Sequence, residues 1–512
     1  MKTLSAVLLI ICCSLKLVAQ EVSLTDLNFS NAFEKQAFED VAKGAPDVFL
    51  LFVASSGNAT QEDFQNFKLR LKQFVSDLNP EKMQRYSGKK KVRKIFEAVQ
   101  DDWLMKYDFE NRFTDIFQGG YFNCVSSTAL HALVLNEFDI PYTISEEPQH
   151  VYLVAQPDDE NIIMEGTDPF DGYQRLTDRL VQAQLQSLVS RKVITEEELH
   201  SPDLRSVLND LYPQRDISLL ELVSIQYYNQ AIYDFEKSKY LEAYQNALKA
   251  YYITPNEKFR SILYSTSVNW LAQRNLQSEY YTGIMAMFAI TDTTKDHYDL
   301  VAEEFGAVGY SLLIEERKPS ELDSLYKRLH IKLKEPYLLK RMAFTYHSLK
   351  ADYAAKLGLF YDGYSHASQA MSIDPENLDV INILLTSTAQ LIYAQKLTDA
   401  SDSLKSLSVR FPGLIENNIW RSLYAEQLLQ DVWKELGDSY SNKVDDKIEE
   451  FESFMNDPNL IINHELIGSA YSRLALKRFN KSKAKAKETL YKALLWAPGN
   501  SNLLRVKQML GV

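Results

Sequence analysis

A short pattern of small residues and proline recurs three times in the C-terminal part of the chain and constrains its fold more than any other feature. Two small residues stand seven apart, and a proline follows five residues later: Ala243, Ala250 and Pro255; Gly363, Ala370 and Pro375; Ala486, Ala493 and Pro498. Small side chains let one helix pack closely on another, and proline ends the second helix. The rest of residues 216–512 is patterned as helices with almost no strand signal. The sequence therefore predicts an all-α solenoid here.

The three triplets resemble the second half of the tetratricopeptide repeat, and a weaker copy ends at Pro412. The resemblance implies a concave face that binds a protein or peptide partner. This region shows no catalytic constellation. His464 and Glu465 begin like a zinc-protease helix, but Gly468 stands where the second histidine is needed. We therefore expect no metal site and no cofactor.

Charge and length exclude several other classes of protein. The formal net charge is -13 at pH 7, and phosphate binding requires a positive surface, so we expect no nucleic-acid partner. No apolar run approaches the roughly 20 residues that span a bilayer, so we expect no stable membrane insertion. A chain of 512 residues is too long for one core, which predicts two or more domains.

The first 20 residues have the pattern of a secretory signal peptide. Lys2 supplies the positive charge, Ala6 to Cys13 the apolar run, and Leu17 to Gln20 a small-residue cleavage site. We therefore expect an exported protein, periplasmic or secreted, that is soluble after cleavage. The other two cysteines lie within this segment, so Cys124 would be the only thiol of the mature chain. Such a thiol is either buried and inert or kept because it reacts.

The stretch from Gln118 to Tyr173 contains the residue types of cysteine-nucleophile chemistry. Cys124 follows a glycine pair by a few residues and opens an apolar, helix-forming run. A thiol in the first turn of a helix faces unpaired backbone N–H groups and the positive end of the helix dipole, which favour the nucleophilic thiolate. Gln118 could donate a hydrogen bond to a developing oxyanion. The alternative for Gln118 is an ordinary surface position.

A histidine and a carboxylate downstream could complete a triad. His150 opens the alternating strand HVYLVA, whereas His131 lies seven residues along the cysteine's helix, about 10 Å away and too far for direct proton transfer. A hairpin turning at QPDDEN pairs position 150 with about 167 and predicts Asp168 beside the histidine. Glu165 would lie nearer Tyr152 and is the reserve, since a one-residue slip exchanges the two faces. The alternative for the Asp-Pro pair is a turn.

These residues resemble the transglutaminase-like superfamily, which has a papain-like α+β fold. In that family a cysteine begins a helix, a histidine begins a strand and an Asp-Pro closes a following strand, and Cys124, His150 and Asp168 match in order. A bacterial family that fuses such a core to C-terminal tetratricopeptide repeats is also similar, through Asp139-Ile140-Pro141, Pro148-Gln149-His150 and Asp168-Pro169-Phe170-Asp171-Gly172. Gln149 departs from the usual glycine, and no tryptophan follows the histidine.

The resemblance implies a transglutaminase-like domain over residues 21–205, followed by a tetratricopeptide-repeat solenoid over residues 216–512. It implies an exported acyl-transfer protein, either a hydrolase of peptide or amide bonds or a transglutaminase-type enzyme. Cys124 would be the nucleophile, His150 the base and then the acid, and Asp168 the group that orients the imidazole. Members of the fused family often lack the cysteine. The alternative is therefore a non-catalytic interaction protein with an inactive transglutaminase-like domain.

Overall fold

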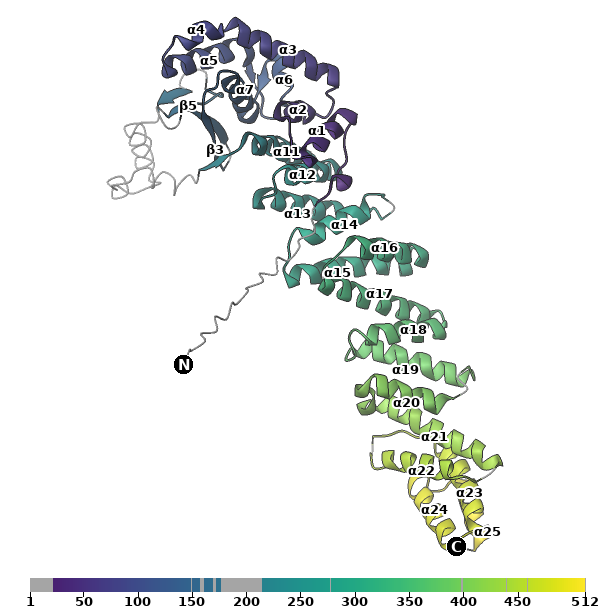
Figure 1. Ribbon diagram of the computed structural model, residues 1–512. Helices are drawn as coiled ribbons and strands as arrows, with labels where there is room; N and C mark the ends of the chain where they lie inside the picture. The colour runs from purple at the N-terminus through teal and green to yellow at the C-terminus, as the bar shows by residue number, and fades with distance from the viewer. Residues whose placement is uncertain are drawn as a thin grey trace, which may run out of the picture. The chain divides into compact units, whose positions relative to one another are not determined.

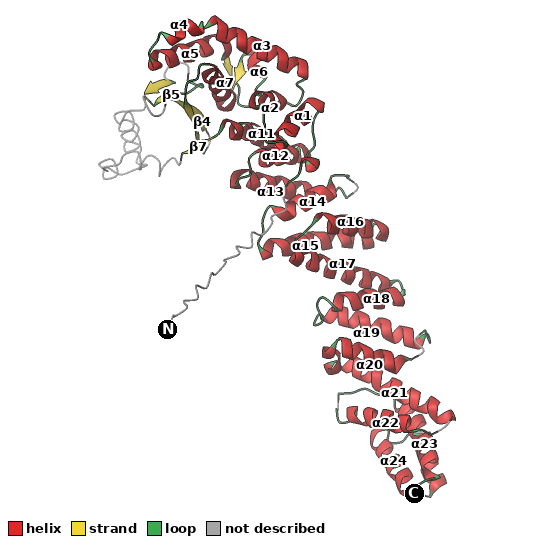
Figure 2. Cartoon of the chain, in the orientation of Figure 1, coloured by secondary structure: helices red, strands yellow, loops and turns green. Residues whose placement is uncertain are grey.

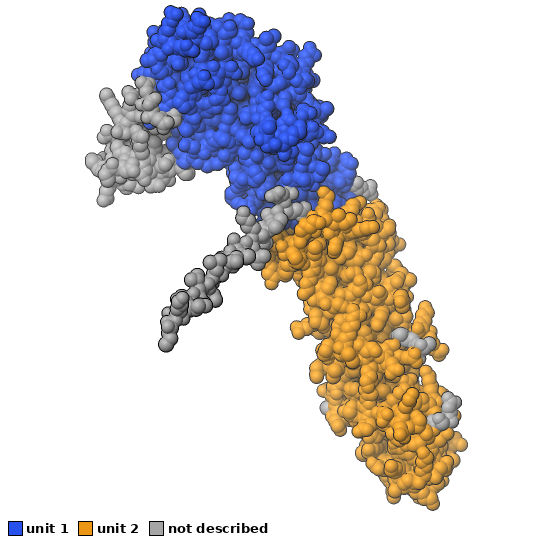
Figure 3. Space-filling view, viewed as in Figure 1, with its two compact units in different colours: residues 1–293 blue, residues 294–512 orange. Residues whose placement is uncertain are grey.

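The computed structural model describes residues 22–148, 150–156, 161–168, 172–175, 214–276, 278–396, 399–438, 440–457 and 459–511. Within these ranges the chain is mostly helical, with one five-stranded and one two-stranded sheet (Figures 1 and 2). The predicted signal peptide, residues 1–20, and the predicted end of the first domain at residue 205 lie outside them. The chain divides into two compact units, residues 1–293 and 294–512, which Figure 3 draws in blue and orange.

Unit 1 begins with helices that polar residues cap at their N-termini. The caps of the longer ones are Asn31, Asp47, Thr60 and Ser87, and each side chain accepts a hydrogen bond from a backbone N–H in the first turn. Aromatic side chains at helical spacing then form the core between these helices. The elements are η1 (Leu24–Asp26), α1 (Ala32–Ala42), α2 (Val48–Ala54), α3 (Gln61–Asp77), α4 (Pro80–Gln84) and α5 (Gly88–Trp103).

The next part of unit 1 contains the segment around Cys124. Its elements are β1 (Lys106–Tyr107), α6 (Asp115–Gly119), β2 (Tyr121–Phe122), α7 (Cys124–Glu137), β3 (Tyr142–Glu147), β4 (His150–Ala155), β5 (Ile162–Met164), β6 (Tyr173–Arg175) and β7 (Arg215–Ile217). β1 and β2 pair in parallel, and the five-stranded sheet is antiparallel in the order β6-β5-β4-β3-β7. The helix predicted to begin at Cys124 and the strand predicted to begin at His150 are both present.

Helix α7 is the centre around which unit 1 packs. It lies against β3 and β4 of the sheet and also contacts α3, α5 and α11. The Thr128 hydroxyl donates a hydrogen bond to the Val151 carbonyl at 3.3 Å, which holds α7 against β4 one residue after His150. Alternate residues of β4 are buried, as its HVYLVA pattern predicts. The start of α7 and the start of β4 are therefore brought together.

Unit 1 extends beyond the predicted boundary at residue 216, because α11 (Leu219–Glu236), α12 (Tyr240–Ile253), α13 (Glu257–Leu271) and α14 (Tyr281–Ile290) belong to it. A buried ion pair contributes to this packing. Lys249 Nζ of α12 lies 2.8 Å from Glu34 Oε1 of α1, and the Tyr227 hydroxyl of α11 donates to the same carboxylate at 3.0 Å. The first helices of the predicted solenoid thus share a core with the Cys124 helix.

Unit 2 is all-helical in its described residues, in agreement with the predicted all-α region, and Figure 1 shows its helices following one another. The small residues of the repeated pattern lie at helix contacts, where Ala370, Ala486 and Ala493 are fully buried. Its elements are α15 (Lys295–Tyr310), η2 (Ser311–Glu315), α16 (Pro319–Lys332), α17 (Pro336–Lys356), α18 (Phe360–Met371), α19 (Leu378–Tyr393), α20 (Ala400–Arg410), η3 (Pro412–Glu416), α21 (Asn418–Asp438), α22 (Asn442–Phe454), α23 (His464–Phe479), α24 (Lys483–Trp496) and α25 (Ser501–Leu510).

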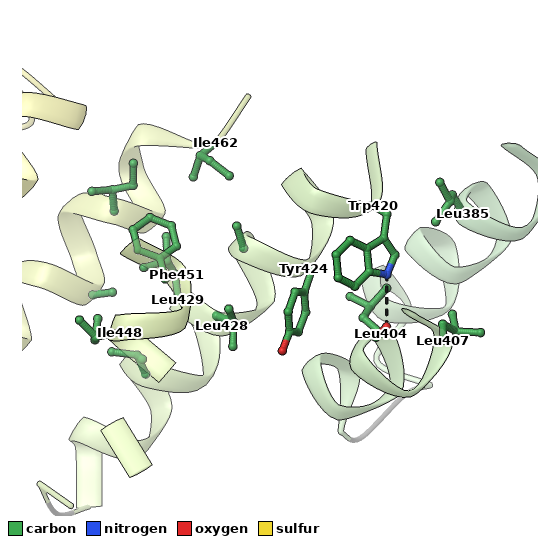
Figure 4. Close-up of a cluster of buried hydrophobic side chains, with 14 of the residues drawn as sticks. Leu385, Leu404, Leu407, Trp420, Tyr424, Leu428, Leu429, Ile448, Phe451 and Ile462 are labelled. Atoms are coloured by element: carbon green, nitrogen blue, oxygen red, sulfur yellow. Dashed lines mark hydrogen bonds between the residues drawn. The ribbon is translucent and has the colours of Figure 1, made fainter. Parts of the chain in front are cut away.

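One continuous apolar core joins α17 to α25 in unit 2. Figure 4 shows part of it, with Trp420 and Tyr424 of α21 stacked at a centroid separation of 5.0 Å. The Trp420 indole N–H donates to the Leu404 carbonyl at 3.2 Å, so the polar atom of this buried ring is satisfied. Across the described parts of both units, no helix is long and apolar enough to cross a membrane.

Candidate active site

Cys124 is the first residue of α7, and a capping box begins the helix there. The Asn123 side chain accepts a hydrogen bond from the Ser126 N–H at 3.0 Å, and the Ser126 hydroxyl accepts one from the Asn123 N–H at 2.9 Å. The first hydrogen bond along the helix joins the Ser127 N–H to the Asn123 carbonyl. The N–H groups of Cys124 and Val125 precede it, so they are available to a negatively charged atom at the helix end.

His150 and Glu165 form the second part of the site. Nε2 of His150 is hydrogen-bonded to Oε2 of Glu165, with about a third of the imidazole exposed. The other oxygen of Glu165 accepts hydrogen bonds from the Thr167 N–H at 3.0 Å and from its hydroxyl at 2.6 Å. These two bonds hold the carboxylate in place, and the carboxylate in turn fixes the orientation of the imidazole.

The Cys124 side chain interacts with the same imidazole. The interaction with Cys124 is the largest of the effects that raise the pKa of His150 to about 10, and the hydrogen bond that His150 donates to Glu165 is the next. Burial of Glu165 would raise the pKa of its carboxyl, but its bonds to His150 and Thr167 outweigh burial and lower that pKa. His150 therefore carries a positive charge at neutral pH between a sulfur atom and a carboxylate.

The carboxylate bonded to His150 is that of the reserve residue, Glu165, and the orienting role of Asp168 stays a prediction. The register of β4 and β5 pairs Leu153 with Met164, and β5 ends there, before position 167. Glu165 follows β5 directly, where its N–H donates to the Gly172 carbonyl at 2.7 Å and its carboxylate reaches the histidine that begins β4. The main chain of Asp168 closes a turn, since its carbonyl accepts the Gly172 N–H at 2.9 Å.

Two further residues considered in the sequence lie apart from this chemistry. Gln118 is exposed near the end of α6, and its side chain makes no hydrogen bond within the described ranges, so its oxyanion role stays a prediction. His131 is buried and stacks on Phe96 with ring centroids 5.4 Å apart. Its Nδ1 donates to the Ser127 carbonyl at 2.9 Å, and burial lowers the pKa of His131 to about 4. It is a packing residue.

Two tyrosines near the cysteine carry no local sequence pattern that marks them as site residues. Tyr233 of α11 donates a hydrogen bond from its hydroxyl to the Phe109 carbonyl at 2.7 Å. Burial, followed by the negative charge of Cys124, raises the pKa of Tyr233. The pKa of Tyr107 in β1 is also raised, first by burial and then by Cys124 and Glu165. Tyr233 is more than 100 residues from Cys124 in the sequence, so only the tertiary fold reveals that it is near.

Exposed apolar side chains flank the cysteine. Of the five large apolar residues that are exposed in the described part of unit 1, four precede Cys124 by fewer than 20 positions: Met105, Tyr107, Phe109 and Tyr121. They belong to β1, β2 and the residues next to β1. Exposed apolar side chains gathered in one segment are typical of a surface that meets a ligand or another chain.

Comparisons of the chain with protein-family models, with curated proteins and with solved structures find no match. In the parts of the chain that the structure describes, no group of three or more His, Cys, Asp or Glu side chains is arranged to hold a metal ion. Conclusions about chemistry therefore depend on the geometry of Cys124, His150 and Glu165 themselves.

Proposed function

We propose that this protein is a cysteine-dependent acyl-transfer enzyme, either a hydrolase of peptide or amide bonds or a transglutaminase-type enzyme. Cys124 is the nucleophile, His150 is the base and then the acid, and Glu165 orients the imidazole in the role first assigned to Asp168. The observation that supports this most is the hydrogen bond between His150 and a Glu165 carboxylate that Thr167 holds in place, at the end of the strand that packs against the Cys124 helix. A nucleophile, a base and an orienting group in this order are typical of covalent catalysis.

In the proposed mechanism His150 enters the reaction as an imidazolium, and the Cys124 sulfur beside it acts as the thiolate nucleophile. The sulfur attacks the carbonyl carbon of the substrate, and the free N–H groups at the start of α7 face the oxygen that becomes negative. His150 then gives its proton to the leaving nitrogen, and a thioester remains on Cys124. Water or an amine resolves the thioester, which gives hydrolysis or acyl transfer.

The arrangement of elements supports the transglutaminase-like, papain-like fold as part of this proposal. The helix that begins with the cysteine packs against an antiparallel sheet, and the histidine begins a strand of that sheet. The N-terminal pattern of residues 1–20 adds export to the proposal. An exported enzyme with one mature cysteine would have no partner for an internal disulfide.

Alkylation of the folded protein by iodoacetamide across pH tests whether Cys124 is an accessible nucleophile. We expect rapid labelling at neutral pH, because His150 remains charged up to a pKa of about 10 and a positive charge beside a thiol favours its nucleophilic form. Cys124→Ala is the control for labelling elsewhere, and His150→Gln should slow the reaction at neutral pH. A Cys124 that resists the reagent until the protein unfolds would rule out the enzyme proposal.

A second role, recruitment of a protein partner, is proposed for the helical repeats of unit 2. Large side chains there lie open to solvent, among them Tyr361, Tyr393 and Ile461, which are 73%, 87% and 82% exposed. Tetratricopeptide-type helix pairs bind partners through such surfaces. Cys124→Ala should leave partner capture intact, whereas the triple change of these side chains to serine should abolish it. The opposite result would assign recruitment to unit 1.

A further inference from the structure

Backbone pairing places Tyr107 beside the segment that leads into Cys124. In the parallel register of β1 and β2, Tyr107 lies opposite Phe122, two residues before the cysteine. The two rings meet edge-on with their centroids 6.0 Å apart. The Asp108 N–H also donates to the Phe122 carbonyl at 2.8 Å. Tyr107 is therefore fixed to the strand that ends at the proposed nucleophile.

The loop after Tyr107 is held from two directions. The Phe109 carbonyl accepts hydrogen bonds from the Tyr233 hydroxyl at 2.7 Å and from Nδ2 of Asn123 at 3.2 Å. The same Asn123 amide donates to the Asn111 carbonyl at 3.3 Å. Because Asn123 is also the cap of α7, the loop and the helix start share one set of bonds. A donor carried by this segment is held in place before a substrate arrives.

The Tyr107 hydroxyl itself is available to a ligand. The residue is 49% exposed, and its hydroxyl makes no hydrogen bond to any residue that the structure describes. Burial of the ring, with the nearby negative charges of Cys124 and Glu165, raises the pKa of this phenol, so the O–H remains protonated at physiological pH. A neutral phenol on the strand paired with Tyr121–Phe122, with no hydrogen-bond partner among the described residues, is a donor that a ligand can use.

We propose that the Tyr107 hydroxyl donates a hydrogen bond to the oxyanion that forms when Cys124 attacks a carbonyl; this inference rests on the acyl-transfer function proposed above. When the sulfur–carbon bond forms, the carbonyl π electrons move to the oxygen. Tyr107 and the N–H groups at the start of α7 stabilise that negative oxygen. The oxygen's electron pair then restores the carbonyl, the bond to the leaving group breaks, and His150 supplies its proton. Tyr107 keeps its own proton throughout.

The full-length protein can be tested with two reagents that differ only in their need for an oxyanion donor. p-Nitrophenyl acetate acylates a cysteine through a tetrahedral oxyanion, whereas iodoacetamide alkylates it by displacement without one. In Tyr107→Phe we expect the single-turnover acylation rate to fall about 10- to 100-fold and alkylation to change less than about twofold. Tyr121→Phe is the matched control, since it removes a hydroxyl from an exposed tyrosine of the paired strand.

Each other outcome overturns the inference in a recognisable way. Equal acylation of the wild type and Tyr107→Phe shows that the hydroxyl does not contact the oxyanion. An equal loss in both reactions shows that Tyr107 acts on the cysteine itself and not on the reacting oxygen. Wild-type protein that iodoacetamide labels but the ester does not acylate would refute the acyl-transfer function, and the inference with it.

Discussion

Replacing Glu165 with glutamine tests the central contact of the proposed site. The change keeps the size of the side chain but removes the charge that is bonded to His150. The pKa of His150 is raised from 6.5 to about 10, first by Cys124 and then by Glu165. A hydrogen bond to a charged group contributes about 1.5–3 kcal/mol. Because a third of the imidazole is exposed, solvent screening favours the lower end, about 1.5 kcal/mol.

The free energy of this hydrogen bond converts to a change in pKa, since a pKa change of one corresponds to about 1.4 kcal/mol. Glu165→Gln should therefore lower the pKa of His150 by about one, to about 9. Titration of the histidine ring signals by NMR gives the value, with the His150 signal assigned by its loss in His150→Gln. Iodoacetamide labelling of Cys124 over the same pH range provides an independent readout.

Asp168→Asn is the comparison that could refute this reasoning. It removes the carboxylate that sequence register favoured while leaving the backbone turn at that position free to form. We expect the pKa of His150 to fall by less than half as much as in Glu165→Gln. A larger fall in Asp168→Asn would mean that Asp168, and not Glu165, orients the imidazole in solution.

Three further results follow from the packing and charge of unit 1. Gly166→Ala should lower the free energy of unfolding by about 1–3 kcal/mol in denaturant unfolding, because the new methyl would lie within 3 Å of α7. Gly283→Ala is the control and should not lower it, because a methyl there has nothing within 4 Å. Lys249→Met should cost about 3–5 kcal/mol, because Glu34 would remain buried without its cation; an unchanged unfolding midpoint would contradict this. The stabilising effect of His150, measured against His150→Gln, should be complete between about pH 4.5 and 6.5. It should decline toward pH 10 as the raised pKa is passed, and below 4.5 as Glu165 protonates; a pH-independent difference would contradict it.

Local sequence patterns were sufficient to predict the elements that carry the site. The Cys124 helix follows from its apolar run, and the His150 strand follows from strict alternation in HVYLVA. The all-α character of unit 2 follows from the repeated small residues and prolines. Each of these depends on neighbours in the sequence, which is why a single sequence contains the information.

The choice between Glu165 and Asp168 could not be settled in the same way. The sequence argument continued the hairpin register to position 167, but β4 and β5 pair only as far as Leu153 and Met164, so alternation does not place the residues that follow. β5 also ends at Met164, and the chain then enters a turn that Gly172 closes onto the carbonyl of Asp168. A turn of this kind depends on backbone contacts that periodicity does not report.

The contribution of α11 to the site was equally hidden from the sequence, and it changes how the chain should be divided. Its residues Tyr233 and Gln226 donate hydrogen bonds to the carbonyls of Phe109 and Asn111, the same two carbonyls to which Asn123 donates. Helix α11 therefore supports the cap of the cysteine helix as well as the loop beside it. A boundary at residue 216 would separate the proposed nucleophile from this support, whereas the boundary at residue 293 keeps them in one unit. The start of the predicted solenoid is thus a structural part of the proposed active site.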